Sequence, residues 1–216
     1  MARKGSVYGS ADRQGLRTQL ASRYAAAARI ARHRRFFALT NATRTHRILD
    51  VGCGTIGLRQ FEPSLDITGL DRVERPDYPG PFVVADATER LPFEDDQFDL
   101  VVANSVIEHI DPIQRAALAA EIRRVGRGRM IQTPAIGFPV EPHSLLPFAH
   151  WLPERLRRPY WKLGVSGDWE QIDLLSKREF ENLFGRALAE RVGPLAKSWV
   201  AITTVDGLEI EPSALS

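Results

Sequence analysis

The sequence predicts an α/β fold built on an open, mostly parallel sheet. From residue 47 onward, short apolar runs alternate with polar connectors, as strands alternate with crossover helices in this class. The runs are apolar on both faces, which is typical of strands buried between two layers of helices. The first run also ends in a glycine-rich loop, Gly52 to Gly57, at the place where such sheets bind ligands.

Five buried strands account for the first part of this pattern. They are expected at residues 47–53, 66–71, 81–86, 98–105 and 129–133. Residues 112–126, between the fourth and fifth strands, have the apolar spacing of a helix packed on a sheet. The side chains expected to face the sheet are Ile113, Ala116, Leu118, Ile122 and Val125.

A second helix and a strand pair are expected to complete the sheet. Ser176 and Glu179 form the capping-box pattern of a helix start, and Gly185 lies where that helix would stop. The apolar runs at 187–196 and 198–205 then predict the strand pair.

Residues 133–164 depart from this alternation. They follow the fifth expected strand, on the carboxyl edge where open sheets bind their ligands. The segment holds six prolines together with Trp151, Tyr160 and Trp161. We expect a substrate lid or wall here, and an excursion that only covers the sheet edge is the alternative.

The charge is divided unevenly along the chain. Its formal net charge is +2, yet residues 1–47 carry 11 Lys or Arg and a single acid, Asp12. We expect residues 1–46 to form a basic helical arm, with a helix over 20–40, and residues 47–216 to form the sheet domain. Such an arm indicates either an anionic partner, such as nucleic acid or a membrane surface, or a helix with a solvated basic face.

The composition is that of a globular protein without disulfides or membrane spans. The 216 residues are 44% apolar and 26% charged, which allows one domain with a sizeable core. Cys53 is the one cysteine, so the chain cannot form an internal disulfide. Its apolar runs are too short to cross a bilayer, and the first residues lack the apolar middle of a secretory signal, so we expect a cytoplasmic location.

Three acids mark the ends of the first three strands. Asp50 precedes the glycine loop and is expected to face the ligand, where it would repel a pyrophosphate by about 4 kcal/mol per charge pair. Asp71 ends the second strand, where a carboxylate commonly binds a ribose diol. Asp86 ends the third and suits an exocyclic amine. A nucleoside that carries an ammonium and a sulfonium, S-adenosylmethionine, fits these charges.

Three motifs strengthen this interpretation. "ILDVGCGTIG" (48–57), "LD" (70–71) and "ADATERLPFEDDQFDLVVANSVIEHI" (85–110) resemble class I S-adenosylmethionine-dependent methyltransferases, in particular their small-molecule, type 11-like branch. The resemblance covers residues 47 to about 125. It implies a Rossmann-like three-layer sandwich with strand order 3-2-1-4-5-7-6 and an antiparallel last strand.

The resemblance also implies which residues hold the cofactor. The loop residues flank the methionine part, Asp71 binds the ribose, the residues after the third strand bind the adenine, and the end of the fourth strand lies under the methionine part. The cofactor-binding residues expected on this basis are Asp50, Gly52, Cys53, Gly54, Asp71, Arg72, Asp86, Ala87, Asn104 and Ser105. We expect Cys53 to be a small loop residue, since no base or cation that would activate its thiol is adjacent in sequence.

Methyl transfer needs a base only where the acceptor must lose a proton. His109 follows the fourth strand and His143 lies in the 133–164 segment, so both are candidate catalytic residues. From the same segment, Glu141, His150 and Trp151 are expected to contact the acceptor.

We expect no metal ion. The run Ser105-x-x-Glu108-His109 resembles the metal-binding Glu-x-x-Glu-His of ubiquinone-type O-methyltransferases, but Ser105 replaces the first glutamate. Two neighbouring ligands seldom make a divalent site.

The acceptor is expected to be small and hydrophobic, lipid-linked or sugar-linked, and methylated on oxygen in preference to nitrogen. The apolar, aromatic insert with its basic Arg155, Arg157 and Arg158 also suits transient contact with a membrane surface. DNA is not expected, because Asn104 is not followed by the Pro-Pro-aromatic run of DNA amino-methylases. RNA methylation through the basic arm and a non-catalytic, cofactor-binding partner subunit are the alternatives.

Overall fold

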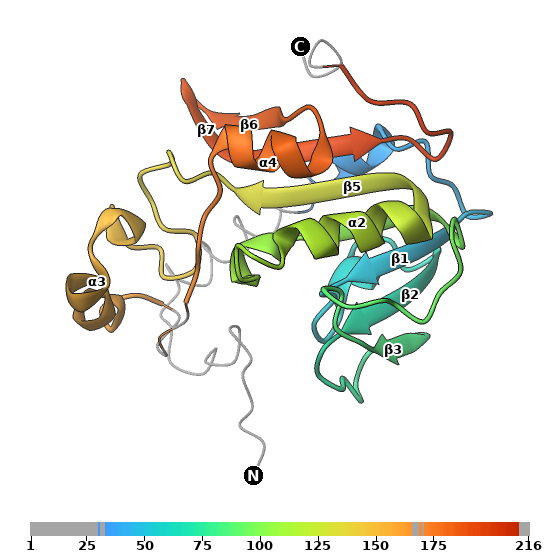
Figure 1. Ribbon diagram of the computed structural model, residues 1–216, viewed down its shortest axis with the longest axis horizontal. Coiled ribbons are helices and arrows are strands. Elements are labelled where there is room, and N and C mark those ends of the chain that lie inside the picture. The colour runs from blue at the N-terminus through green and yellow to red at the C-terminus, as the bar shows by residue number, and fades with distance from the viewer. Residues whose placement is uncertain (1–29, 31–32, 166–168, 170, 212–216) are drawn as a thin grey trace, which may run out of the picture.

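A single sheet organises the molecule, whose computed structural model describes residues 30, 33–165, 169 and 171–211. The seven strands lie in the order β3-β2-β1-β4-β5-β7-β6 (Figure 1). They are β1 (Arg47–Val51), β2 (Asp66–Asp71), β3 (Phe82–Val84), β4 (Phe98–Asn104), β5 (Gly126–Pro134), β6 (Leu188–Val192) and β7 (Leu195–Thr203). β1 to β5 are parallel, and β7 lies antiparallel between β5 and β6. The predicted fold class is confirmed.

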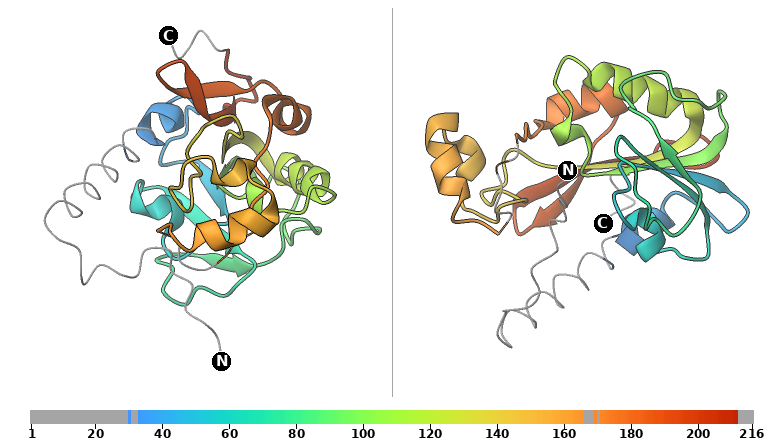
Figure 2. Two further views of the ribbon diagram at one scale, coloured as in Figure 1. Left: turned by 90° about the vertical axis from the view of Figure 1, so that its left-hand side faces the viewer. Right: turned by 90° about the horizontal axis from the view of Figure 1, so that it is seen from below.

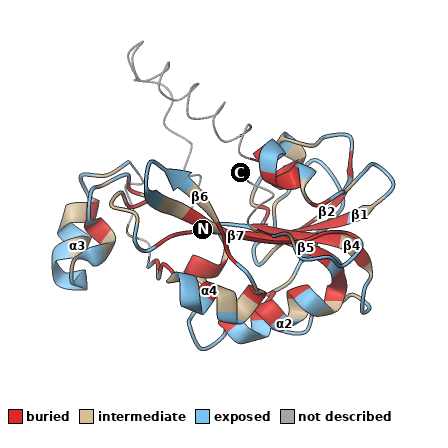
Figure 3. Ribbon diagram, turned by 90° about the horizontal axis from the view of Figure 1, so that it is seen from above, coloured by how far each residue is buried: buried red, intermediate tan, exposed pale blue. Residues whose placement is uncertain are grey.

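Helical elements cover the sheet on both faces. On one face, α2 (Arg115–Val125) and α4 (Lys177–Phe184) pack over a core that includes Leu49 and Phe180. On the other, the helical residues 33–38 and the 3₁₀ helix η2 (Gly57–Gln60) pack over a core that includes Ile48 and Phe36 (Figure 3). Neighbouring residues of β1 thus face opposite cores, as the pleat of a strand requires. Three layers result.

The face that α2 turns to the sheet differs from the prediction at its start. Leu118, Ile122 and Val125 are buried as expected, but Ile113 is 89% exposed and Ala116 is exposed. Arg115 takes the inward position instead, and its guanidinium donates to the backbone oxygens of Ile110 and Asp173 at 3.1 and 2.6 Å. These hydrogen bonds of Arg115 are the reason why the apolar stripe of the helix starts one turn later than predicted.

The predicted boundaries of α4 are confirmed. Glu179 N donates to Ser176 Oγ at 3.3 Å, and Ser176 N donates back to the Glu179 carboxylate at 2.9 Å. The chain leaves the helix through Gly185 with φ of 86°. This reciprocal cap gives hydrogen-bond partners to two amides at the start of the helix, where no backbone oxygen within the helix can accept from them.

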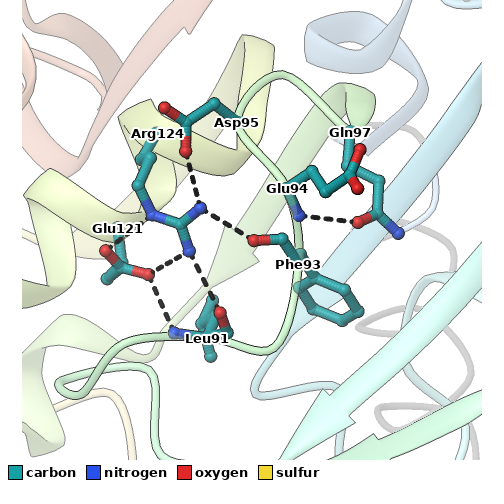
Figure 4. Close-up of polar contacts among 7 residues, drawn as sticks. All are labelled: Leu91, Phe93, Glu94, Asp95, Gln97, Glu121 and Arg124. Carbon is teal, nitrogen blue, oxygen red and sulfur yellow. Dashed lines mark hydrogen bonds and ion pairs between the residues drawn. The ribbon is translucent and has the colours of Figure 1, made fainter.

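A half-buried ion-pair network fastens the loop between β3 and β4 to α2 (Figure 4). Arg124 donates to the backbone oxygens of Leu91 and Phe93 and pairs with Glu121 and Asp95, at 2.7 to 3.1 Å. Leu91 N in turn donates to Glu121 at 2.9 Å. Part of the 85–110 motif therefore has a structural role, because the network fixes the loop that follows Asp86.

Residues 135–165 leave the carboxyl edge of the sheet as an excursion with the 3₁₀ helix η4 (Ala149–Trp151) and α3 (Glu154–Trp161). Figures 1 and 2 show α3 standing off one end of the sheet. Trp161 forms a small cluster of its own with Ile172 and Leu174, apart from the two main cores. Most of the expected basic arm lies outside the described residues. Within the described part, no helix is long and apolar enough to cross a membrane.

Candidate active site

The carboxyl ends of the parallel strands open into a cavity of about 860 Å³. Parallel register aligns Val51 with Leu70 and Asp71 with Val84, so the loops after β1, β2 and β3 meet at one edge. We call the part of the cavity lined by these loops the cofactor side. The part lined by η3 (Ile107–His109), residues 134–145 and the β6–β7 edge is the acceptor side.

Backbone geometry shapes the glycine loop on the cofactor side. Gly52 N and Cys53 N donate to Leu70 O at 2.8 and 3.2 Å, which folds the loop back over β2. Gly52 and Gly54 have φ of 67° and 59°, a region that favours glycine. Gly54 lines the cavity, and a Cβ built on it would meet nothing within 4 Å. The loop therefore presents bare backbone to open space, as close approach of a ligand requires.

Asp50 does not line this cavity, contrary to the expectation that its carboxylate faces the ligand. The side chain is 4% exposed and accepts a 2.6 Å hydrogen bond from Leu58 N behind the loop. Burial raises the pKa of Asp50 to about 7, although the Leu58 amide opposes the shift. A side chain on Gly57 would collide with this carboxylate, because an added Cβ would lie 2.2 Å from Oδ2. Asp50 thus shapes the loop from behind, and the direct repulsion of a pyrophosphate by this carboxylate does not apply.

Cys53 also lies behind the cavity wall. It is 6% exposed, and burial, together with the charges of Asp50 and Asp71, raises its pKa to about 12. Its thiol therefore stays protonated at neutral pH and is a poor nucleophile. This environment accords with the interpretation of Cys53 as a small loop residue.

Asp71 and Arg72 line the cavity at the end of β2. Asp71 Oδ2 accepts hydrogen bonds from Arg75 at 3.0 Å, and Oδ1 accepts one from Val73 N at 3.2 Å. The pairing with Arg75 was not predicted, because the three intervening residues lie outside regular structure and give no local signal for it. The carboxylate keeps lone pairs free for the hydroxyls of a ribose.

Asp86 and Ala87 line the next stretch of wall. Although burial alone would raise its pKa, Asp86 has a lowered pKa because Thr88 N and Oγ1 donate to it at 2.9 and 2.7 Å. Ser105 lines the cavity with φ of 53°, whereas Asn104 lines a separate hollow of about 150 Å³. Of the ten expected cofactor residues, Asp50, Cys53 and Asn104 do not line the main cavity.

His109 and His143, which lie 34 residues apart in the sequence, meet on the acceptor side. Their ring centroids are 5.0 Å apart, and both line the cavity. His143 Nδ1 lies 3.0 Å from Glu141 Oε1, and Glu141 is only 1% exposed. The Glu141 carboxylate also accepts hydrogen bonds from the amides of His143 and Ser144. These bonds outweigh the effect of burial and lower the pKa of Glu141 to about 2.

None of the three residues expected to contact the acceptor, Glu141, His150 and Trp151, lines the cavity. The His150 ring and the Trp151 indole both lie within hydrogen-bond distance of Ile136 O, at 3.0 and 2.8 Å. They brace the insert from outside, and Trp151 is 51% exposed. The cavity wall contains residues that the sequence did not indicate, notably Gln132, Leu145, Lys197 and Ser198. Only the pairing of β5 with β7 brings Lys197 and Ser198 there, and this pairing has no local sequence signal.

The sheet order, the bare glycine loop and the acids after β2 and β3 are the features that the resemblance to class I, S-adenosylmethionine-dependent methyltransferases implies. Residues 49–129 match the family model described as "Methyltransferase domain". The match spans the glycine loop, Asp71, Asp86 and η3. The matched residues, 81 of the 216, therefore belong to a methyltransferase domain, and S-adenosylmethionine is its cofactor.

Solved structures share the fold of this chain. A protein of Pyrococcus horikoshii OT3 is similar, with 19% identity, a TM-score of 0.55 and coverage of 80% of this chain and 88% of that chain. The 1,6-didemethyltoxoflavin-N1-methyltransferase of Burkholderia thailandensis, solved with 1,6-didemethyltoxoflavin and S-adenosylhomocysteine, has 18% identity, a TM-score of 0.50 and coverage of 87% and 84%. At such identities the likeness concerns the fold. A search of curated proteins finds no match.

Proposed function

We propose that this enzyme transfers the methyl group to a hydroxyl oxygen of a small hydrophobic, lipid-linked or sugar-linked acceptor. The observation that carries the proposal is the two-sided cavity. One side is formed by the loops after β1, β2 and β3, and the other by apolar residues of the insert around His109 and His143. A volume of about 860 Å³ leaves room for an acceptor beside a nucleoside cofactor.

The residues of the cofactor side fit the cofactor. Bare backbone at Gly52 and Gly54 would lie along its methionine part, Asp71 would bind its ribose diol, and Asp86 with Ala87 would bind its adenine. The bound cofactor supplies an electrophilic methyl group on a sulfonium, so the protein mainly orients the acceptor and excludes water. The loop after β3, fastened by Arg124, keeps the adenine end rigid.

The insert would form the wall against which the acceptor lies. Phe138, Val140 and Leu145 contribute apolar side chains to the cavity, and Lys197 and Ser198 add polar groups at the β7 edge. This mixture suits a molecule with an apolar body and a few polar groups. A free RNA strand fits less well, since stacking platforms of exposed aromatic rings are typical of its binding sites.

His143 is the better placed of the two histidines to accept the proton of the hydroxyl. Its Nδ1 is paired with Glu141, which orients the ring and leaves Nε2 as the nitrogen for an acceptor. Proton transfer by a positioned group contributes about 10²–10⁴-fold to a rate. His109 contacts the same space and would assist in placing the hydroxyl.

The proposal can be tested with methyl-labelled cofactor and cell extracts. Purified protein is incubated with extract, and the products are separated into organic-soluble, polar small-molecule, RNA and protein fractions. We expect label in the organic-soluble or polar small-molecule fraction, on an oxygen. Label in RNA would favour the alternative in which the basic arm binds RNA. Tight S-adenosylhomocysteine binding without label in any fraction would favour a non-catalytic subunit.

A further inference from the structure

A third side chain joins His109 and His143 beside the cavity. Glu108 and His109 belong to η3, directly after β4, whereas His143 comes from the insert 34 residues later. One donor atom from each of the three side chains lies within 4.8 Å of the others. Two ring nitrogens and a carboxylate oxygen therefore converge from two separate segments of the chain.

Glu108 has an unpartnered oxygen at this point. The residue is 1% exposed, and its Oε2 accepts a 2.9 Å hydrogen bond from Thr133 Oγ1. Its Oε1 is buried without a hydrogen-bond partner. A buried carboxylate oxygen without a partner is costly, and a cation is one of the few groups that would remove the cost.

The arrangement around His143 is typical of a metal-binding histidine. A histidine that binds a metal through one nitrogen commonly donates its other N–H to a carboxylate. Glu141 provides that carboxylate, 3.0 Å from Nδ1, and is itself fixed by the amides of His143 and Ser144 and by Ser144 Oγ. The ring is therefore held in one orientation, with Nε2 as the remaining ligand atom.

We propose that Glu108, His109 and His143 bind one divalent transition-metal ion of the zinc type, which holds the acceptor's hydroxyl oxygen at an open coordination position. Two histidines and one glutamate, with a further position for water or substrate, form a known catalytic zinc set. The expectation that no metal binds depended on two local ligands. His143, which no local pattern could place beside them, supplies the third.

This inference rests on the proposed transfer to a hydroxyl and refines the part played by the histidines. They become ligands, and the ion lowers the pKa of the coordinated hydroxyl. The hydroxyl proton is lost to water, the oxygen forms a bond to the methyl carbon, and the carbon–sulfur bond breaks, so that neutral S-adenosylhomocysteine leaves. Coordination would draw the three donor atoms closer together. Ligands bound at about 2.0–2.2 Å from zinc lie closer to one another than the 4.8 Å within which these atoms now lie.

Equilibrium zinc binding tests the site directly. The tag-free chain is stripped with a chelator, dialysed against dilute zinc, and assayed by elemental analysis and calorimetry. We expect about one zinc ion per chain. Cobalt substitution should give the visible absorption of a four- or five-coordinate site. His143→Ala and Glu108→Gln should weaken zinc binding at least about tenfold, and Glu141→Gln, which removes the orienting carboxylate, about 10–100-fold.

Two controls separate this result from misfolding and from other ligands. His46→Ala, in a turn far from the cavity, should bind zinc like the unmodified chain, which has only five histidines and one cysteine. Every variant should keep its S-adenosylhomocysteine affinity. Absence of stoichiometric zinc, or equal affinity in the unmodified chain and His143→Ala, would overturn the metal site. Methyl transfer that persists undiminished after chelation would overturn its role and leave the proposed function standing.

Discussion

The cofactor side and the acceptor side of the cavity are held together in different ways. On the cofactor side, main-chain hydrogen bonds from Gly52 N and Cys53 N to Leu70 O fold the glycine loop over β2, and Arg124 fastens the loop after β3. On the acceptor side, two buried carboxylates hold the groups that would act on the acceptor, with Glu108 bonded to Thr133 and Glu141 to His143. Substitutions on the acceptor side should therefore impair transfer and leave cofactor binding intact, whereas substitutions on the cofactor side should weaken cofactor binding.

The largest expected effect comes from His143→Ala. Removal of the group that activates the hydroxyl should lower turnover about 10²–10⁴-fold. The affinity for S-adenosylhomocysteine, measured by calorimetry, should change less than about twofold, because the partners of this ring, Glu141 and His109, belong to the acceptor side. A parallel loss of cofactor affinity would show that the two sides are not independent.

The pH dependence of stability tests the position of Asp50 behind the cofactor side. Its folded pKa of about 7 lies above its ordinary 3.8, so between these values the folded protein holds a proton that the unfolded chain releases. Asp50 therefore makes stability fall as pH rises from about 4 to 7, by up to about 4 kcal/mol.

Asp50→Asn removes this titration and keeps an oxygen for Leu58 N. Urea unfolding of the cofactor-free protein should show that the loss of stability between pH 5 and pH 8 is smaller in the variant. Parallel stability curves for the two proteins would contradict the buried, protonated state of Asp50.

The sequence could predict those features that depend on residues close to one another along the chain. The order of elements, the capping box at Ser176 and the acids after β2 and β3 depend on near neighbours, and these predictions agree with the structure. Asp50 was misplaced because a strand-end position does not reveal whether a side chain turns toward the ligand or into the loop. Arg115 was overlooked because a buried arginine needs carbonyl partners, here Ile110 and Asp173, that only the fold supplies.

The acceptor side was less predictable, because its residues come from segments that only the fold brings together. Glu108 and His109 are adjacent in sequence, but the approach of His143 depends on the path of the excursion at residues 135–165, which contains five prolines. His150 lies in the same excursion and has the same chemistry, yet it turns to Ile136 O outside the cavity. Composition cannot distinguish two such histidines.

Trp161→Ala should separate the stability of the insert from that of the sheet. Trp161 is 1% exposed in a cluster that shares no residue with the two main cores. Its truncation should lower the free energy of unfolding by about 3 kcal/mol, which is the low end of the range for a large aromatic residue. Hydrogen exchange should rise in residues 140–165 and not in β1 to β5, with unchanged cofactor affinity. Faster exchange throughout the sheet would mean that the insert and the sheet unfold together.

Asp71→Ala is expected to have the smallest effect, and it tests the cofactor side most directly. The loss of its hydrogen bonds to the ribose should weaken S-adenosylhomocysteine binding by about 1–3 kcal/mol. Arg75→Gln is the matched comparison, because Arg75 contacts Asp71 Oδ2 and itself lines the cavity. If Arg75 only orients Asp71, Arg75→Gln should lower the affinity for S-adenosylhomocysteine less than Asp71→Ala does. The double variant should then bind no more weakly than Asp71→Ala alone. An equal, additive loss would indicate that Arg75 contacts the cofactor itself.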